Sequence, residues 1–285
     1  MLKRLLTTLS LMALGVPAQA APALWEIRDG DSAVQIFGSL HVMPADTDWR
    51  TPLFDETLAE ADQVVFETDV RPMAMAEVSA KAFVRGIYVD GTQLTDVVDA
   101  PLADALRAQA EQVGVPFGPM LAMRPWMAAN TLSAAAMVRL GLVEQGVEFV
   151  LEPEISAERL AFLETGDEQI EVLAGAPDDE QIALLQATVD EFDQLPKVLS
   201  KLLSHWLGGT PDKLGPLFLM EMGGFEGRYL ERLLLARNRN WIPPIEQMLA
   251  DNRNNLIIVG AGHLVGEGSV IELLEAAGYS VERIQ

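Results

Sequence analysis

Two of the three histidines in this chain follow the same short pattern. His41 closes Gly38-Ser-Leu-His41 and His263 closes Gly260-Ala-Gly-His263, and each pattern comes directly after an apolar run typical of a buried strand. A neutral imidazole can bind a divalent metal ion or take a proton from water. Glycine ahead of each histidine lets the backbone turn sharply and lets a ligand approach closely. The pair therefore indicates a site for metal binding or acid–base chemistry.

Two further apolar runs end on acids. Glu67 follows 63–66 and Glu164 follows 159–163. Because ligands bind beyond the carboxyl ends of strands in open α/β sheets, we expect both carboxylates and both histidines to converge on one edge. Each residue also has a plainer interpretation, as a strand-end histidine bonded to a loop carbonyl or as a carboxylate at a helix start. The repeated pattern favours a site.

Two arginines and an asparagine complete the set of candidates. Arg237 and Asn238 lie near the end of a predicted helix, where Arg237 could bind a substrate carboxylate, stabilise an oxyanion or complement the helix dipole. Arg124 precedes Pro125-Trp126, and we expect it to pair with Glu67 or Glu164. Arg124 and Asn238 are candidate substrate-binding residues. The third histidine, His205, lies in an amphipathic pattern without glycine and is expected on a helix face.

The hydrophobic pattern predicts the elements that must position these side chains. Strands are expected at 24–28, 33–37, 63–67, 159–163, 255–259 and 279–284. Helices are expected at 52–61, 73–85, 102–113, 120–140, 167–174, 178–207, 226–240, 243–250 and 269–277, with Pro125 kinking or starting a helix. This order predicts an α/β fold, with α+β as the alternative. Its centre would be a mixed, largely parallel sheet, with a large helical insertion at about 72–250.

Composition excludes several classes of protein. The 285 residues include 49% hydrophobic ones, which excludes a disordered chain, and the formal net charge is −22, which disfavours binding to nucleic acid or anionic lipid. Cysteine is absent, so disulfides and thiolate chemistry are excluded.

The first twenty residues have the features of a secretory signal peptide. Lys3 and Arg4 precede an apolar stretch that is too short to span a bilayer, and Ala18-Gln19-Ala20 is typical of a cleavage site. We therefore expect a mature chain of residues 21–285, forming a single domain, that is periplasmic or secreted and has no membrane span after cleavage.

The same residues carry a resemblance to a known family. Leu24-Trp25, Gly38-Ser-Leu-His41, Val65-Phe-Glu67, Met123-Arg-Pro-Trp126, Leu163-Glu-Thr165, Arg237-Asn238 and Val259-Gly-Ala-Gly-His263 resemble, in order, the TraB/GumN family. Gly146-Val-Glu-Phe stands where many relatives have Gly-Val-Asp. The resemblance implies a fold related to erythromycin esterases and ChaN-like haem-binding proteins. Through the TIKI proteases it implies a metal-dependent peptidase in which His41, Glu67 and His263 are the metal ligands.

Two functions follow as hypotheses. In the first, the protein is a metal-dependent hydrolase of a peptide or other amide or ester, with Mn, Co, Zn or Fe as the ion and Glu67 as ligand or general base. A metal-free variant would use His41 and Glu67 to activate water. In the second, the same cleft binds haem, a metal or a small ligand without turnover, in a supporting role in the envelope. The sequence does not indicate an oligomeric state.

Overall fold

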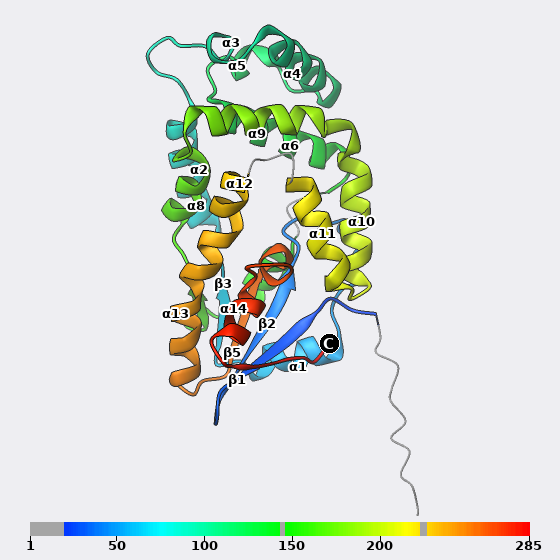
Figure 1. The fold of residues 1–285 in the computed structure, drawn as a ribbon, viewed down its shortest axis with the longest axis vertical. Helices are drawn as coiled ribbons and strands as arrows, with labels where there is room; N and C mark the ends of the chain where they lie inside the picture. Colours follow the sequence, from blue (N-terminus) through cyan, green and yellow to red (C-terminus); the bar gives the residue numbers. More distant parts are fainter. Residues whose placement is uncertain (1–19, 143–145, 223–226) are drawn as a thin grey trace, which may run out of the picture.

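The computed structural model describes residues 20–142, 146–222 and 227–285 (Figure 1). The predicted signal peptide, residues 1–20, lies outside the described residues except for Ala20. Within the described ranges, no helix combines the length and the apolar character needed to cross a membrane.

The centre of the fold is a six-stranded mixed sheet with the strand order β4-β3-β5-β2-β1-β6. Its strands are β1 (Leu24–Arg28), β2 (Ala33–Ser39), β3 (Gln63–Phe66), β4 (Leu160–Phe162), β5 (Asn255–Gly260) and β6 (Ser280–Arg283). The neighbours β4, β3, β5 and β2 are parallel, and β1 is antiparallel to β2 and to β6. The expected α/β fold with a largely parallel sheet is confirmed.

Helices cover both faces of the sheet, which explains why its central strands are mostly apolar and largely buried. All six residues of β5 are buried. One face packs against α1 (Pro52–Glu60) and α10 (Leu195–Leu207) through Phe54 and Trp206. The other face packs against α13 (Ala236–Ala250) and α14 (Val270–Ala276) through Trp241 and Leu274.

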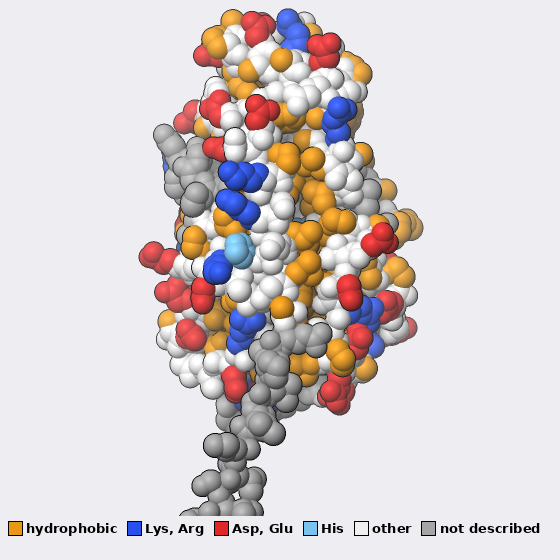
Figure 2. Space-filling view, turned by 90° about the vertical axis from the view of Figure 1, so that its right-hand side faces the viewer, with side chains coloured by type: hydrophobic (Ala, Val, Ile, Leu, Met, Phe, Trp, Pro, Cys, Tyr) orange, Lys and Arg blue, Asp and Glu red, His pale blue; other side chains and the backbone are white. Residues whose placement is uncertain are grey.

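A separate helical region lies beyond the carboxyl edge of the parallel strands (Figure 1). It has its own hydrophobic core, which includes Leu106, Trp126, Leu132 and Leu185. Its helices are α2 (Pro72–Gly86), α3 (Leu94–Val97), α4 (Ala100–Val113), α5 (Phe117–Met120), α6 (Pro125–Arg139), α8 (Gly166–Ala174) and α9 (Asp178–Asp190). The connecting elements include the turns η1 (Glu152–Glu154) and η2 (Phe192–Gln194) and the helices α11 (Pro211–Met222) and α12 (Gly227–Leu230). Acidic and basic side chains are interspersed on the face shown in Figure 2, on either side of an apolar band.

Proline explains where two predicted helices are divided. The helix expected at 120–140 begins at Pro125, because proline favours the first turn of a helix. The residue before it, Arg124, donates its backbone N–H to Gly86 O instead of joining the helix. The helix expected at 178–207 is likewise divided into α9 and α10, and Pro196 lies in the first turn of α10. The expectation that Pro125 starts a helix is confirmed, whereas the prediction of one continuous helix at 178–207 is wrong.

Proline fails to divide a third segment. The two helices expected at 226–240 and 243–250 form one run, in which the π-helical turn η3 (Glu231–Leu235) continues into α13 through Pro243 and Pro244. Trp241, Ile245 and Leu249 are buried on one side of α13 against the sheet. Pro243 is exposed, so the backbone carbonyls that lose their partners face solvent, and packing of the apolar side outweighs the loss.

Candidate active site

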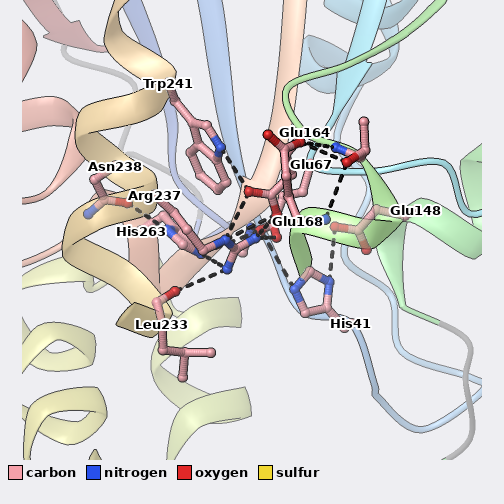
Figure 3. Close-up of polar contacts among 12 residues, drawn as sticks. His41, Glu67, Glu148, Glu164, Glu168, Leu233, Arg237, Asn238, Trp241 and His263 are labelled. Atoms are coloured by element: carbon pink, nitrogen blue, oxygen red, sulfur yellow. Dashed lines mark hydrogen bonds and ion pairs between the residues drawn. The ribbon is translucent and has the colours of Figure 1, made fainter. Parts of the chain in front are cut away.

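The parallel strands bring the predicted residues to one edge of the sheet. Ser39 at the end of β2 pairs with Gly260 at the end of β5, and Phe66 of β3 pairs with Ile258 of β5 and Phe162 of β4. His41, Glu67, Glu164 and His263 follow these four strand ends, and His263 lies on the short turn η4 (Ala261–Leu264). The close-up in Figure 3 shows the four side chains together with Arg237 and Asn238 of α13.

Glu67 lies at the centre of the group and is 6% exposed. Its Oε1 accepts a hydrogen bond of 2.7 Å from Gly260 N–H. The same oxygen lies 3.8 Å from His41 Nε2 and 3.7 Å from His263 Nε2. A Cβ atom at Gly260 would lie 3.1 Å from His41 Nε2 and 3.2 Å from Glu67 Oε1, so a larger residue here would crowd both side chains.

The hydrogen bonds of His263 determine its tautomer. Arg237 Nη1 lies 3.0 Å from His263 Nε2, and because a guanidinium can only donate, Nε2 is the acceptor. The proton is therefore on Nδ1, which donates to Asn238 Oδ1 at 2.6 Å. Asn238 Nδ2 in turn donates to Gly268 O at 2.8 Å, which orients the amide. Asn238 is thus a positioning residue for His263.

His41 has a different environment. Its Nδ1 lies 3.2 Å from Glu148 Oε1, and its side chain is 58% exposed. Glu148 comes from α7 (Val147–Leu151), a helix that the sequence pattern did not predict, and it also accepts a hydrogen bond from Ser39 Oγ. Gly146 allows this contact, because a side chain there would collide with the backbone of His41. The sequence feature that could have revealed Glu148 is the Gly146-Val-Glu148 motif. Its acid is one methylene longer than the aspartate of Gly-Val-Asp.

The pKa values of His41 and His263 are shifted in opposite directions. The charge of Glu148, with a smaller contribution from Glu67, raises the pKa of His41 above its ordinary value, although solvent around the exposed ring screens this effect. Burial lowers the pKa of His263 to about 3. Burial also opposes ionisation of Glu67, but the imidazoles of His263 and His41, the guanidinium of Arg237 and the N–H of Gly260 lower its pKa to about 2.

Arg237 joins the acids at the sheet edge. It donates from Nη2 to Glu67 Oε2 and from Nε to both carboxylate oxygens of Glu164 at 3.1 Å. Glu164 also accepts a 3.3 Å hydrogen bond from Trp241 Nε1. Glu164 therefore serves as the buried counter-ion of Arg237.

Arg124 does not reach this group. It pairs with Asp178 at 3.8 Å and lies over the ring of Tyr88. The expectation that Arg124 pairs with Glu67 or Glu164 is wrong, because Pro125 starts α6 at the far end of α2 and holds Arg124 there. His205 lies on α10 with its Nδ1 3.1 Å from Thr210 Oγ1, in keeping with a helix-face residue.

A cavity of about 540 Å³ opens above the site. His41, Glu67, Glu148 and Arg237 form its polar end. Apolar side chains of α2, α6 and α8 line most of the remainder. A cavity of this size falls within the range of small-molecule sites, about 300–1,000 Å³.

The donor set suits a divalent metal ion in chemistry but not in its present arrangement. Two imidazoles and a carboxylate are ligands for Zn, Mn, Co or Fe, and both Nδ1 atoms have the acceptor partners usual behind metal-bound histidines. However, His263 Nε2 is occupied by Arg237, and no group of three acidic or histidine side chains within the described ranges is already arranged around an ion position. An ion could bind His263 only after the guanidinium shifts.

Comparisons with known proteins agree with the family resemblance seen in the sequence. The model of the TraB/PrgY/gumN family matches residues 23–283. The chain is 23% identical over 256 residues to "Uncharacterized protein YbaP" of Escherichia coli, covering 89% of this chain and 92% of the relative. A stretch of 57 residues, 19% of this chain and 11% of the relative, is 39% identical to the "Metalloprotease TIKI homolog" of Amphimedon queenslandica. No solved structure matches the chain.

Proposed function

Because the chain belongs to the TraB/PrgY/gumN family, we propose that it is an exported hydrolase that cleaves amide or ester bonds. One observation carries the proposal: Glu67 Oε1 lies between the Nε2 atoms of His41 and His263, at a sheet edge that opens into a cavity. The similarity of a short stretch to a relative named as a metalloprotease supports the same reaction class.

At the polar end of the cavity, Glu67 acts as the general base and His41 as the general acid. Glu67, which is ionised and lies next to His41, accepts a proton from a water molecule. The oxygen of that water molecule attacks the scissile carbonyl carbon in the same step. His41, kept protonated by Glu148, gives its Nε2 proton to the departing nitrogen or oxygen as that bond breaks. The products are a carboxylic acid and an amine or alcohol. The proton on Glu67 then returns to His41.

Arg237 and His263 position these groups. Arg237 holds Glu67 Oε2, so Oε1 is the oxygen directed toward His41. His263 accepts from Arg237 and thereby fixes the guanidinium. Because a carboxylate with a pKa near 2 is a weak base, we propose a divalent ion as the alternative to proton transfer by His41. His41, Glu67 and His263 would hold the ion once His41 is unprotonated and Arg237 has left His263 Nε2, and the ion would supply the Lewis acidity that activates water.

The test is hydrolysis of 4-nitrophenyl esters and of peptide amides by the purified mature protein, with its metal content measured by elemental mass spectrometry. Glu67→Gln should lower kcat by about 10³-fold, since general acid–base groups contribute roughly 10²–10⁴-fold. Glu60→Gln, which changes an exposed carboxylate at the end of α1, is the matched control and should leave kcat unchanged.

Other outcomes separate the hypotheses. Turnover that persists after chelation, with no bound Mn, Co, Zn or Fe, would leave His41 and Glu67 as a metal-free pair. A wild-type protein that binds ligands but hydrolyses neither substrate class, and in which Glu67→Gln changes only affinity, would be a binding protein. For the export part of the proposal, the mature protein recovered from a periplasmic fraction should begin at Ala21.

A further inference from the structure

The walls of the cavity differ sharply from its polar end. Met75, Val78 and Ala82 of α2 recur at the spacing of one helix face and line one wall. The opposite walls come from α6 and α8, with Trp126, Met127, Ile170 and Leu173 among their lining residues. The groups that carry the chemistry therefore meet an apolar chamber.

Close packing shows that this chamber is built into the fold. A side chain at Gly86 of α2 would lie 2.3 Å from Met127 Cε of α6. A side chain at Gly166 of α8 would lie 2.2 Å from Val78 Cγ2 of α2. Both glycines allow α2 to rest directly on its neighbours, so the three helices that form the walls are held together independently of any ligand.

The charges at the polar end select against an anionic ligand. Arg237 is the cation with a fixed charge among the lining residues, and Glu67 and Glu164 both pair with it. His41 is paired with Glu148. A ligand carboxylate or phosphate entering the cavity would therefore meet buried carboxylates without an uncommitted cation.

We propose that this cavity binds an uncharged apolar substituent of the substrate, adjoining the scissile carbonyl. The substituent is an acyl chain or an apolar amino-acid side chain, and burial in the chamber between α2, α6 and α8 recognises either one. This inference rests on the proposed hydrolase function for its reaction, but the binding that it requires does not depend on turnover.

The test measures binding of N-phenyl-1-naphthylamine, a neutral apolar fluorophore, to the full mature chain. Ala82→Phe fills the chamber from α2 and should weaken binding at least tenfold. Ala80→Phe, the same change at an exposed position on the same helix, is the matched control and should leave the affinity unchanged. Equal affinities of Ala82→Phe and wild type would overturn the proposal.

Competition against the fluorophore in wild type needs no variant, and so holds even if Ala82→Phe fails to fold. Octanamide should compete at least tenfold better than octanoate, and equal or better competition by octanoate would overturn the proposal. N-acetylphenylalanine amide beside octanamide distinguishes a side chain from an acyl chain as the source. Binding without hydrolysis would sink the proposed function alone, whereas hydrolysis of esters that is indifferent to Ala82→Phe would sink this inference alone.

Discussion

The ends of β2 and β5 carry the same four-residue pattern but place their histidines in opposite environments. The side chain of His41 is 58% exposed and lies beside a carboxylate, whereas the side chain of His263 is 5% exposed and lies between an amide and a guanidinium. The strands are hydrogen-bonded neighbours, with Ser39 opposite Gly260. The difference shows that the motif delivers a histidine to the edge, while the surrounding side chains raise or lower the pKa of its imidazole.

The free energy of unfolding should depend most on the buried charges at the end of β5, so the largest expected effect comes from a substitution there. Arg237→Gln leaves the carboxylates of Glu67 and Glu164 buried without their cation, which should lower the free energy of unfolding by about 3–5 kcal/mol. Urea denaturation of the metal-free protein measures it. Arg124→Gln, which removes an arginine from an exposed pair, is the control and should cost less than about 1 kcal/mol. Similar losses in both variants would contradict the assignment of Arg237.

Removing each histidine in turn compares the two ends directly. His263→Ala leaves Asn238 Oδ1 and an Arg237 N–H without their partner and removes a ring that packs on Trp241 with centroids 4.4 Å apart, so we expect a loss of about 2–3 kcal/mol. His41→Ala, at the exposed end, should cost less than about 1 kcal/mol. Thermal and urea unfolding of both variants give the values, and a reversed order would refute the contrast in burial.

The pH dependence of stability should have opposite signs at the two ends. His263 has a depressed pKa in the folded state, so its contribution to stability is present above pH 6.5 and is lost as pH falls toward 3. Between pH 6.5 and 5 the loss should be on the order of 1–2 kcal/mol. His41 has a raised pKa, so its contribution is present below 6.5 and is lost as pH rises toward about 9. Wild type compared with His263→Gln and His41→Gln isolates each contribution in the metal-free protein. The acid-side difference should vanish in the first variant and the alkaline-side difference in the second.

Exchanging the partners gives the smallest expected effect and the finest test. Glu148→Gln should lower the pKa of His41 by about one unit, and Asn238→Asp should raise the pKa of His263 by a similar amount. The chain has three histidines, so their ring protons can be followed by NMR, with His205 of α10 as the reference outside the site. If neither substitution changes the pKa of its neighbouring histidine, Glu148 and Asn238 do not set the charge states of His41 and His263.

Much of the fold could be predicted because its signals are local. Each of the six strands coincides with a short apolar or β-prone run, and the acids and histidines follow directly after these runs. Helix limits were harder to predict, since the exposure of Pro243 and the packing of Trp241 decided that α13 continues. A single sequence shows the prolines but not which of their neighbours face solvent.

The residue pattern alone was enough to place His41, Glu67, Glu164 and His263 at one edge, because strand ends and a parallel order suffice for that. The partners and the charge state of each residue depend instead on tertiary packing. It brought Glu148 from α7 to His41, directed Asn238 to His263, placed Arg237 between two carboxylates and kept Arg124 away. The physical reason is that charge state, tautomer and access depend on burial and on partners distant in sequence, which meet only when helices pack on the sheet.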